Sequence, residues 1–97
     1  MAQFDVYRLK EGPLVVDCQA DLLNYLQSRF VVPLLQPHIV EAGAGLNPRF
    51  TINGEVVHLF PQGAATVQAS ELREQVGNLA VHGYTILNAI DLLLTGV

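Results

Sequence analysis

The stretch Phe50-Thr-Ile-Asn-Gly-Glu-Val-Val-His-Leu-Phe60 predicts an antiparallel β-hairpin. Two short runs rich in apolar residues flank Asn53-Gly54, the dipeptide best suited to the two positive φ angles of a type I′ turn. This hairpin is the clearest local signal in the chain, and it indicates a fold built from antiparallel strands.

A second hairpin is expected near the N-terminus. Residues 4–9 alternate between two faces, Gly12-Pro13 break the pattern, and residues 14–18 resume it with β-branched side chains. Residues 30–35 form a further apolar run, but Pro33 has no backbone N–H to donate. We therefore expect the strand over residues 30–35 to lie at a sheet edge or to be bulged.

The connecting segments carry weaker signals. Residues 19–28 are expected to form a loop with one helical turn, residues 41–48 a loop, and residues 64–68 a strand. Ser70 is a suitable N-cap for a short helix that begins at Glu71 and ends near Gly77.

The chain ends on an apolar segment, for which we expect a helix starting near Thr85. At 100° per residue, Asn88, Asp91 and Thr95 form a narrow polar stripe. The opposite side carries the apolar residues Ile86, Ile90, Leu93, Leu94 and Val97. This apolar surface is wider than one core contact requires, so we expect the end of the helix to dock on a core, a second copy or a partner.

The composition predicts one small domain over residues 1–97, with a homodimer as the simplest way to cover its surplus apolar surface. Hydrophobic residues make up 51% of the chain and charged residues only 14%. The net charge is −4 with five Lys and Arg residues, which argues against a surface that tracks phosphates. Direct nucleic-acid binding is not expected.

The chain is expected to be cytoplasmic. Cys18 is its single cysteine, so no internal disulfide can form. The first residues lack the pattern of a signal peptide, and no apolar run approaches the ~20 residues of a membrane span.

Candidate chemistry is sparse. His38, His58 and His82 do not have the spacing of a metal site, so no metal is expected. Asp17 and Asp21 beside Cys18 leave two interpretations open, a structural role or an acid/base site with an activated thiol. Without a nucleophile motif or cofactor loop, we expect no cofactor and no enzymatic activity.

Four segments together resemble the CcdB family, the toxins of plasmid and chromosomal toxin–antitoxin modules. The resemblance is carried by Gln3-Phe-Asp-Val-Tyr7, Val16-Asp-Cys-Gln-Ala-Asp-Leu-Leu23, Arg29-Phe-Val-Val-Pro-Leu34 and Asn88-Ala-Ile-Asp-Leu-Leu-Leu-Thr-Gly-Val97. It runs from the first residue to the last, in order and at nearly the right spacing.

The resemblance implies a mostly β fold with a C-terminal α-helix. The fold would be an antiparallel SH3-like barrel or sheet with a small second sheet, and the helix would lie at a dimer interface. It also implies a cytoplasmic homodimer that binds the DNA gyrase A subunit and traps gyrase on cleaved DNA. A cognate CcdA-like antitoxin would neutralise it.

The gyrase-binding residues that the resemblance implies are Leu22, Leu23, Asp91, Leu94, Thr95, Gly96 and Val97. Thr95 stands where the best-known plasmid toxin has a tryptophan, and Leu94 replaces an aromatic residue. Two other functions therefore remain open, the first because of Thr95 and the second because a related superfamily of toxins shares the fold. One is a weakly toxic or non-toxic chromosomal relative that keeps dimerisation and antitoxin binding, and the other is an endoribonuclease toxin of the same fold.

Overall fold

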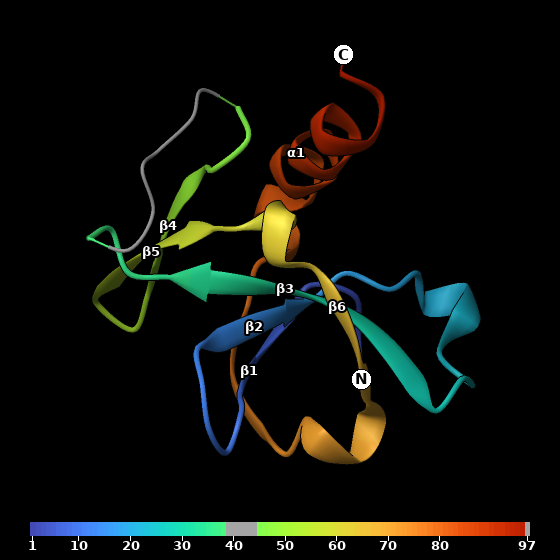
Figure 1. Cartoon of the computed structure of the whole chain (residues 1–97). Helices are drawn as coiled ribbons and strands as arrows, with labels where there is room; N and C mark the ends of the chain where they lie inside the picture. The colour runs from blue at the N-terminus through green and yellow to red at the C-terminus, as the bar shows by residue number, and fades with distance from the viewer. Residues whose placement is uncertain (39–44, 97) are drawn as a thin grey trace.

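The computed structural model describes residues 1–38 and 45–96, and in these ranges most regular structure is β (Figure 1). The strands are β1 (Asp5–Arg8), β2 (Leu14–Asp17), β3 (Ser28–Leu35), β4 (Arg49–Ile52), β5 (Glu55–Leu59), β6 (Ala65–Gln68) and β7 (Glu74–Asn78). One α-helix, α1 (Gly83–Thr95), follows them among the described residues. Short 3-10 turns lie between these elements: η1 (Asp21–Leu23), η2 (Pro61–Gly63), η3 (Ala69–Glu71) and η4 (Ala80–His82).

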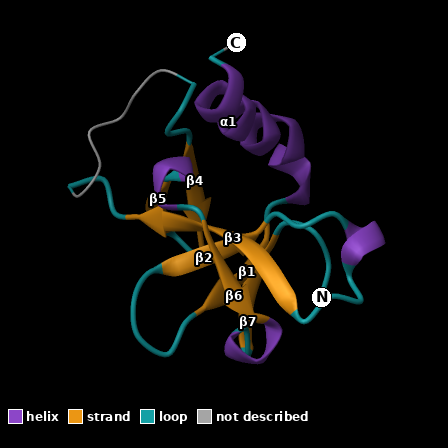
Figure 2. Ribbon diagram, turned by 45° about the vertical axis from the view of Figure 1, so that its right-hand side comes forward, coloured by secondary structure: helices purple, strands orange, loops and turns teal. Residues whose placement is uncertain are grey.

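The described strands form one antiparallel sheet that curls into a half-barrel, with α1 at one end (Figure 2). Its strand order is β4-β5-β3-β2-β1-β7, and β6 pairs with β3 off this path. The mostly β fold with a last helix is therefore confirmed. The expected small second sheet is not separate among the described strands: the β4–β5 hairpin belongs to the same sheet and joins β3 through the pairs Leu34–Leu59 and Leu35–His58.

Strand β3 is central and pairs with β2 in unbroken register through Pro33, so the expectation of an edge strand or a bulge at Pro33 is wrong. One side of β3 pairs with β2, while its other side pairs first with β6, up to Val31, and then with β5, from Leu34. Pro33 lies at the changeover between these two partners. Its carbonyl accepts a hydrogen bond from the N–H of Phe60 (2.9 Å), and its missing N–H falls where the ladder is interrupted.

Both predicted hairpins are present. Asn53 and Gly54 have φ angles of 51° and 81°, as a type I′ turn requires, and they join β4 to β5. The β1–β2 hairpin turns at Gly12, whose φ is 118°. Residues 41–44 of the predicted loop over residues 41–48 lie outside the described residues, and residues 45–48 contain no helix or strand.

The segment after Ser70 does not form the predicted helix. It holds a single 3-10 turn, η3, followed by strand β7, which pairs with β1 through Asp5–Asn78 and Arg8–Glu74. Gln68, not Ser70, caps η3, and Leu72 is buried against the sheet. Pairing with β1 thus overrides a weak local preference for helix.

Helix α1 begins at Gly83, two residues before the predicted start. It buries Gly83, Ile86 and Ala89, and its first turn packs against Phe4, whose ring a Cβ on Gly83 would approach to 2.8 Å. Phe4 adopts a left-handed φ of 72°, which hydrogen bonds to Asp17 and Leu79 hold in place. No helix in the described part of the chain is long and apolar enough to cross a membrane.

Candidate partner-binding surface

The first part of the predicted site, Leu22 and Leu23, lies in turn η1 between β2 and β3. The turn is closed by hydrogen bonds from Leu23 N to Ala20 O and from Asn24 N to Asp21 O. Gln3 N donates to the Asp21 carboxylate at 2.8 Å, and Gln19 Nε2 donates to Leu23 O at 3.0 Å. Leu22 is 87% exposed, so the described residues leave this side chain almost uncovered.

Sequence reasoning missed that this exposed apolar surface is larger than two leucines. Tyr25, Leu26 and Phe30 are also exposed, and together with Leu22 and Leu23 they form what we call the apolar loop surface. The sequence signal for this surface was the presence of large apolar residues in a segment predicted to be a loop, where they have no place in the core. Large apolar groups left in water close together are typical of a protein-binding surface.

The second part of the predicted site lies in the last turn of α1. Leu94 is 74% exposed, and Asp91, Thr95 and Gly96 are exposed as well. The Thr95 hydroxyl donates to the carbonyl of Asp91 at 2.7 Å, and Gly96 ends the helix with a left-handed φ of 77°. Val97 lies outside the described residues.

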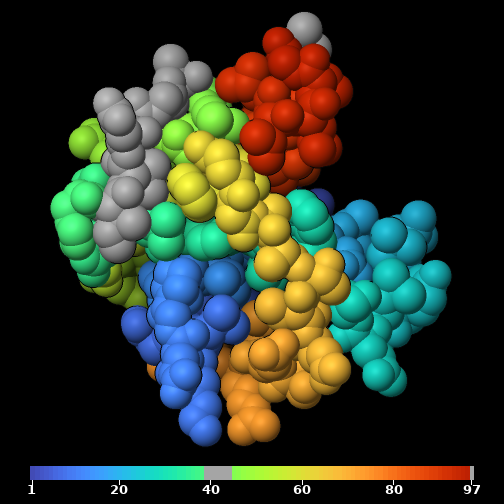
Figure 3. All heavy atoms as spheres, in the orientation of Figure 1, coloured from blue at the N-terminus to red at the C-terminus, as the bar shows by residue number. Residues whose placement is uncertain are grey.

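The chain does not bring the two parts of the predicted site together. Figures 1 and 2 place η1 at the side of the molecule, while the end of α1 points away from it. In the space-filling view they are separate protrusions (Figure 3). A partner that contacts both parts on one chain must therefore span the surface between them.

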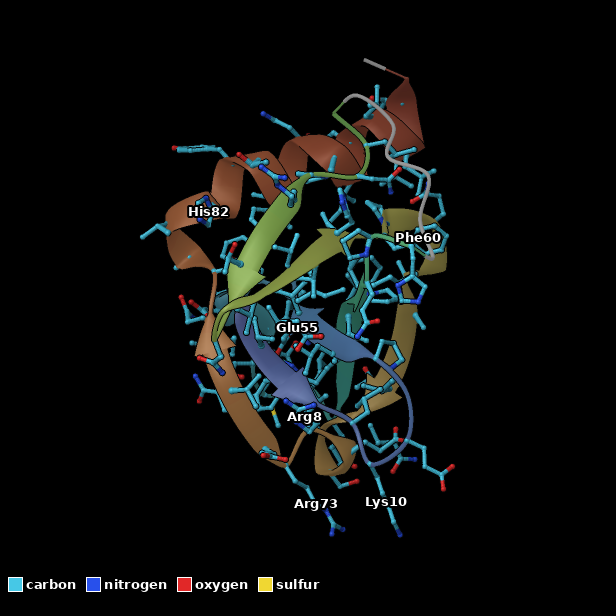
Figure 4. All side chains as sticks on the ribbon, turned by 90° about the vertical axis from the view of Figure 1, so that its left-hand side faces the viewer. Arg8, Lys10, Glu55, Phe60, Arg73 and His82 are labelled. Atoms are coloured by element: carbon cyan, nitrogen blue, oxygen red, sulfur yellow. The ribbon has the colours of Figure 1, made fainter. Side chains whose placement is uncertain are left out.

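A polar hollow lies at the end of the molecule opposite α1. Its volume is about 800 Å³, and it is lined by the β1–β2 turn together with η3 and the start of β7. Figure 4 shows Arg8, Lys10 and Arg73 gathered there. The charged lining consists of these three cations and the carboxylates of Glu11, Glu71 and Glu74.

The contacts within this hollow are loose. Arg8 Nε lies 3.9 Å from a Glu74 oxygen with both side chains mostly exposed, and Arg73 Nε donates to the carbonyl of Ser70 at 3.1 Å. Most of these charged groups therefore remain accessible to a ligand. This cluster could not be predicted from sequence spacing, because its members come from segments about 60 residues apart.

The structure favours a structural role for Asp17 and Cys18. Asp17 is fully buried and paired with Arg29, so it does not face solvent as an acid or base would. Burial, and then the negative charge of Asp17, raises the pKa of the Cys18 thiol to about 12, so the thiol stays protonated. Within the described residues, no group of three His, Cys, Asp or Glu side chains is placed to hold a metal.

The described residues form a small curled antiparallel sheet with a last helix, and they expose apolar side chains at turn η1 and at the end of α1, a combination that is typical of compact partner-binding domains. The comparison with known families is more specific. The family model described as CcdB protein matches residues 3–96, and the chain belongs to the CcdB family. This membership supports a toxin of a toxin–antitoxin module.

Two solved structures share the fold over nearly the whole chain. One is described as an endoribonuclease in complex with its cognate antitoxin from Mycobacterial species, with 14% identity, a TM-score of 0.81 and coverage of 97% of this chain and 94% of that chain. The other, an endoribonuclease from Mycobacterial species, has 13% identity, a TM-score of 0.78 and coverage of 97% and 90%.

These neighbours contradict the expectation that the chain is not an enzyme. The same fold serves endoribonucleases, so the lack of a contiguous catalytic motif gives no ground for excluding catalysis. The physical reason is the same as for the polar hollow: charged groups from segments far apart in the sequence come together only when the sheet has folded.

Proposed function

We propose that this toxin binds the DNA gyrase A subunit and traps the gyrase–DNA cleavage complex. The observation that carries the proposal is the exposure of apolar side chains at the positions that the family resemblance assigns to gyrase, above all Leu22 and Leu94. Buried at an interface, such side chains supply most of the binding free energy, while polar neighbours exclude water and fix the orientation.

The toxin acts as a cytoplasmic homodimer, and a CcdA-like antitoxin neutralises it. The exposure of Leu87 on α1 supports the dimer, because a second copy covers apolar surface that one chain leaves in water. The antitoxin is supported by the family and by the related endoribonuclease that was solved with its cognate antitoxin. Dimerisation also pairs two helix ends, so that Thr95 and Gly96 of both copies form one symmetric patch.

A gyrase cleavage reaction tests the proposal. Purified toxin should accumulate cleaved DNA, and Leu22→Ser and Leu94→Ser should each weaken the effect about tenfold, as expected for an anchor side chain. The matched control is Val81→Ser, because Val81 is 89% exposed but lies outside both parts of the site.

No cleaved DNA with wild-type toxin, beside a known poison that works, would reject gyrase poisoning. Growth after induced expression without antitoxin would then favour the weakly toxic or non-toxic relative.

RNA cleavage is a second candidate, favoured by the charged groups at the polar hollow. Cleavage of a phosphodiester needs a general acid and base, and a cation that stabilises the charge developing on the phosphate. Arg8, Lys10 and Arg73 supply cations beside the carboxylates of Glu11 and Glu74.

Incubation with single-stranded RNA tests this candidate. Arg73→Ala should abolish cleavage, whereas Arg49→Ala, an exposed arginine on β4 outside the hollow, should not. RNA that stays intact with the wild-type toxin removes the candidate.

A further inference from the structure

Arg29 is a fully buried cation next to the most exposed loop of the molecule. Its side chain has no solvent exposure, and Nε and Nη2 lie 2.9 Å and 2.7 Å from the same oxygen of Asp17. Asp17 is also fully buried, and its other oxygen accepts a hydrogen bond from Gln19 N. This ion pair links β2 to the start of β3.

The same guanidinium reaches into turn η1. Arg29 Nη1 donates to Asn24 Oδ1 at 2.9 Å, and Asn24 N in turn donates to Asp21 O, which closes the turn. Asn24 is itself exposed, so the burial of its own side chain does not require this hydrogen bond. Arg29 therefore ties the core pair to the loop that carries Leu22 and Leu23.

The loop depends on such hydrogen bonds because none of its side chains is fully buried. Every residue from 21 to 28 is exposed, and even the better covered Leu23 and Leu26 keep 40% and 38% of their surface in solvent. Further links are the bonds from Gln3 N to Asp21, from Gln19 Nε2 to Leu23 O and from Ala69 N to Gln27 O, and the pairing of Ser28 with Gln68. Few buried contacts are typical of a segment that opens locally.

A buried ion pair is a costly way to stabilise a core, since apolar side chains of similar volume often do as well. The advantage of an ion pair is that it holds its groups in one fixed geometry. Such a geometry matters for a loop that presents apolar groups to a partner with no core packed beneath it. We propose that Arg29 is a positioning residue, which holds the apolar loop surface in one arrangement through Asn24 and so lowers the entropic cost of binding a partner. The choice of gyrase A as that partner rests on the proposed function.

The test uses Asn24→Ala, which removes the loop end of the tie and leaves the buried pair intact. Asn24→Asp is the matched control, because it keeps an oxygen that accepts from Nη1. Affinity for purified gyrase A is measured beside the rate of chymotrypsin cleavage at Leu22, Leu23, Tyr25 and Leu26, which reports opening of the loop without any partner.

For Asn24→Ala we expect cleavage about tenfold faster and gyrase A binding about tenfold weaker, the factor that loss of a charge-assisted hydrogen bond gives. The thermal unfolding midpoint should fall by about 5–10 °C, because the same hydrogen bond is lost from the folded state, and Asn24→Asp should resemble the wild type in all three measurements. Unchanged cleavage would overturn the proposal, and weaker binding without faster cleavage would mark Asn24 as a mere contact. If wild-type toxin does not bind gyrase A, the proposed function fails, and the cleavage rates alone decide the positioning role.

Discussion

At the scale of single residues, the buried pair of Asp17 and Arg29 is the most demanding interaction in the core. Both side chains are fully buried, and Arg29 Nη2 makes no hydrogen bond among the described residues beyond its 2.7 Å ion-pair contact. Each charge is tolerated only because the other neutralises it.

Removing one partner of this pair should therefore be severe. Arg29→Met leaves Asp17 buried without its cation, and we expect the free energy of unfolding to fall by about 3–5 kcal/mol. Urea denaturation followed by circular dichroism measures the change. The double variant Asp17→Asn with Arg29→Met should recover part of the loss, and an equal loss in both variants would contradict the pairing argument.

Because of Cys18, the free energy of unfolding should decrease as the pH rises into the alkaline range. Burial raises the pKa of its thiol from 9.0 to about 12, so above pH 9 the folded chain keeps a proton that the unfolded chain releases. Stability should fall by about 1.4 kcal/mol per pH unit between pH 9 and 12. Burial and the nearby Asp5 carboxylate raise the pKa of Tyr7 as well, which adds to the fall.

Urea titrations at several pH values measure this slope, and Cys18→Ala is the control that should flatten it. The native thiol should also resist iodoacetamide at pH 8 and react readily in urea. A Cys18→Ala variant with the same pH slope would show that the thiol is not responsible.

At the scale of elements, local chemistry controls the β4–β5 hairpin. Gly54 has a φ of 81° with open space around the position of a Cβ, so any substitution acts through backbone strain alone. Gly54→Ala should lower the free energy of unfolding by about 1–2 kcal/mol, the cost of a left-handed conformation for an L-residue. Thermal unfolding measures the loss.

Asn53→Gly is the matched control for this turn. Glycine accepts the φ of 51° at this position, and only the exposed hydrogen bond from Asn53 Nδ2 to Val76 O is lost. The control should cost less than Gly54→Ala, and the reverse order would contradict a type I′ turn as the origin of the strain.

The difference between local and long-range interactions explains which elements the sequence could predict. Both hairpins, the turn at Asp21–Leu23 and the last helix depend on neighbouring residues, and all are present. The central place of β3 and the strand at Glu74–Asn78 depend on pairing with distant segments, which local propensity does not report. For the site, the exposure of Leu22 and Leu94 agrees with the expectation, but Tyr25 and the polar hollow became visible only once the sheet had placed them.

At the scale of the whole molecule, α1 carries more apolar surface than the sheet covers. Ile86 and Ala89 face the core, whereas Leu87, which is 39% exposed, lies on one flank of that buried stripe. With charged residues at only 14% of the chain, few groups are available to keep this flank hydrated. The flank therefore fits a seam between two copies of the chain.

This seam gives a prediction about assembly. Leu87→Glu places a charge in the seam, and it should raise the dimer dissociation constant at least about tenfold, because an unpaired charge at an interface must be desolvated. Sedimentation equilibrium over a range of concentrations measures the constant. Asn88→Glu is the control, since it adds the same charge on the exposed polar stripe of α1 and should leave the dimer intact.

A wild-type chain that stays monomeric at high concentration, or equal weakening by both variants, would contradict this seam. Helical circular dichroism that matches the wild type in both variants would show that the effect lies in association and not in folding.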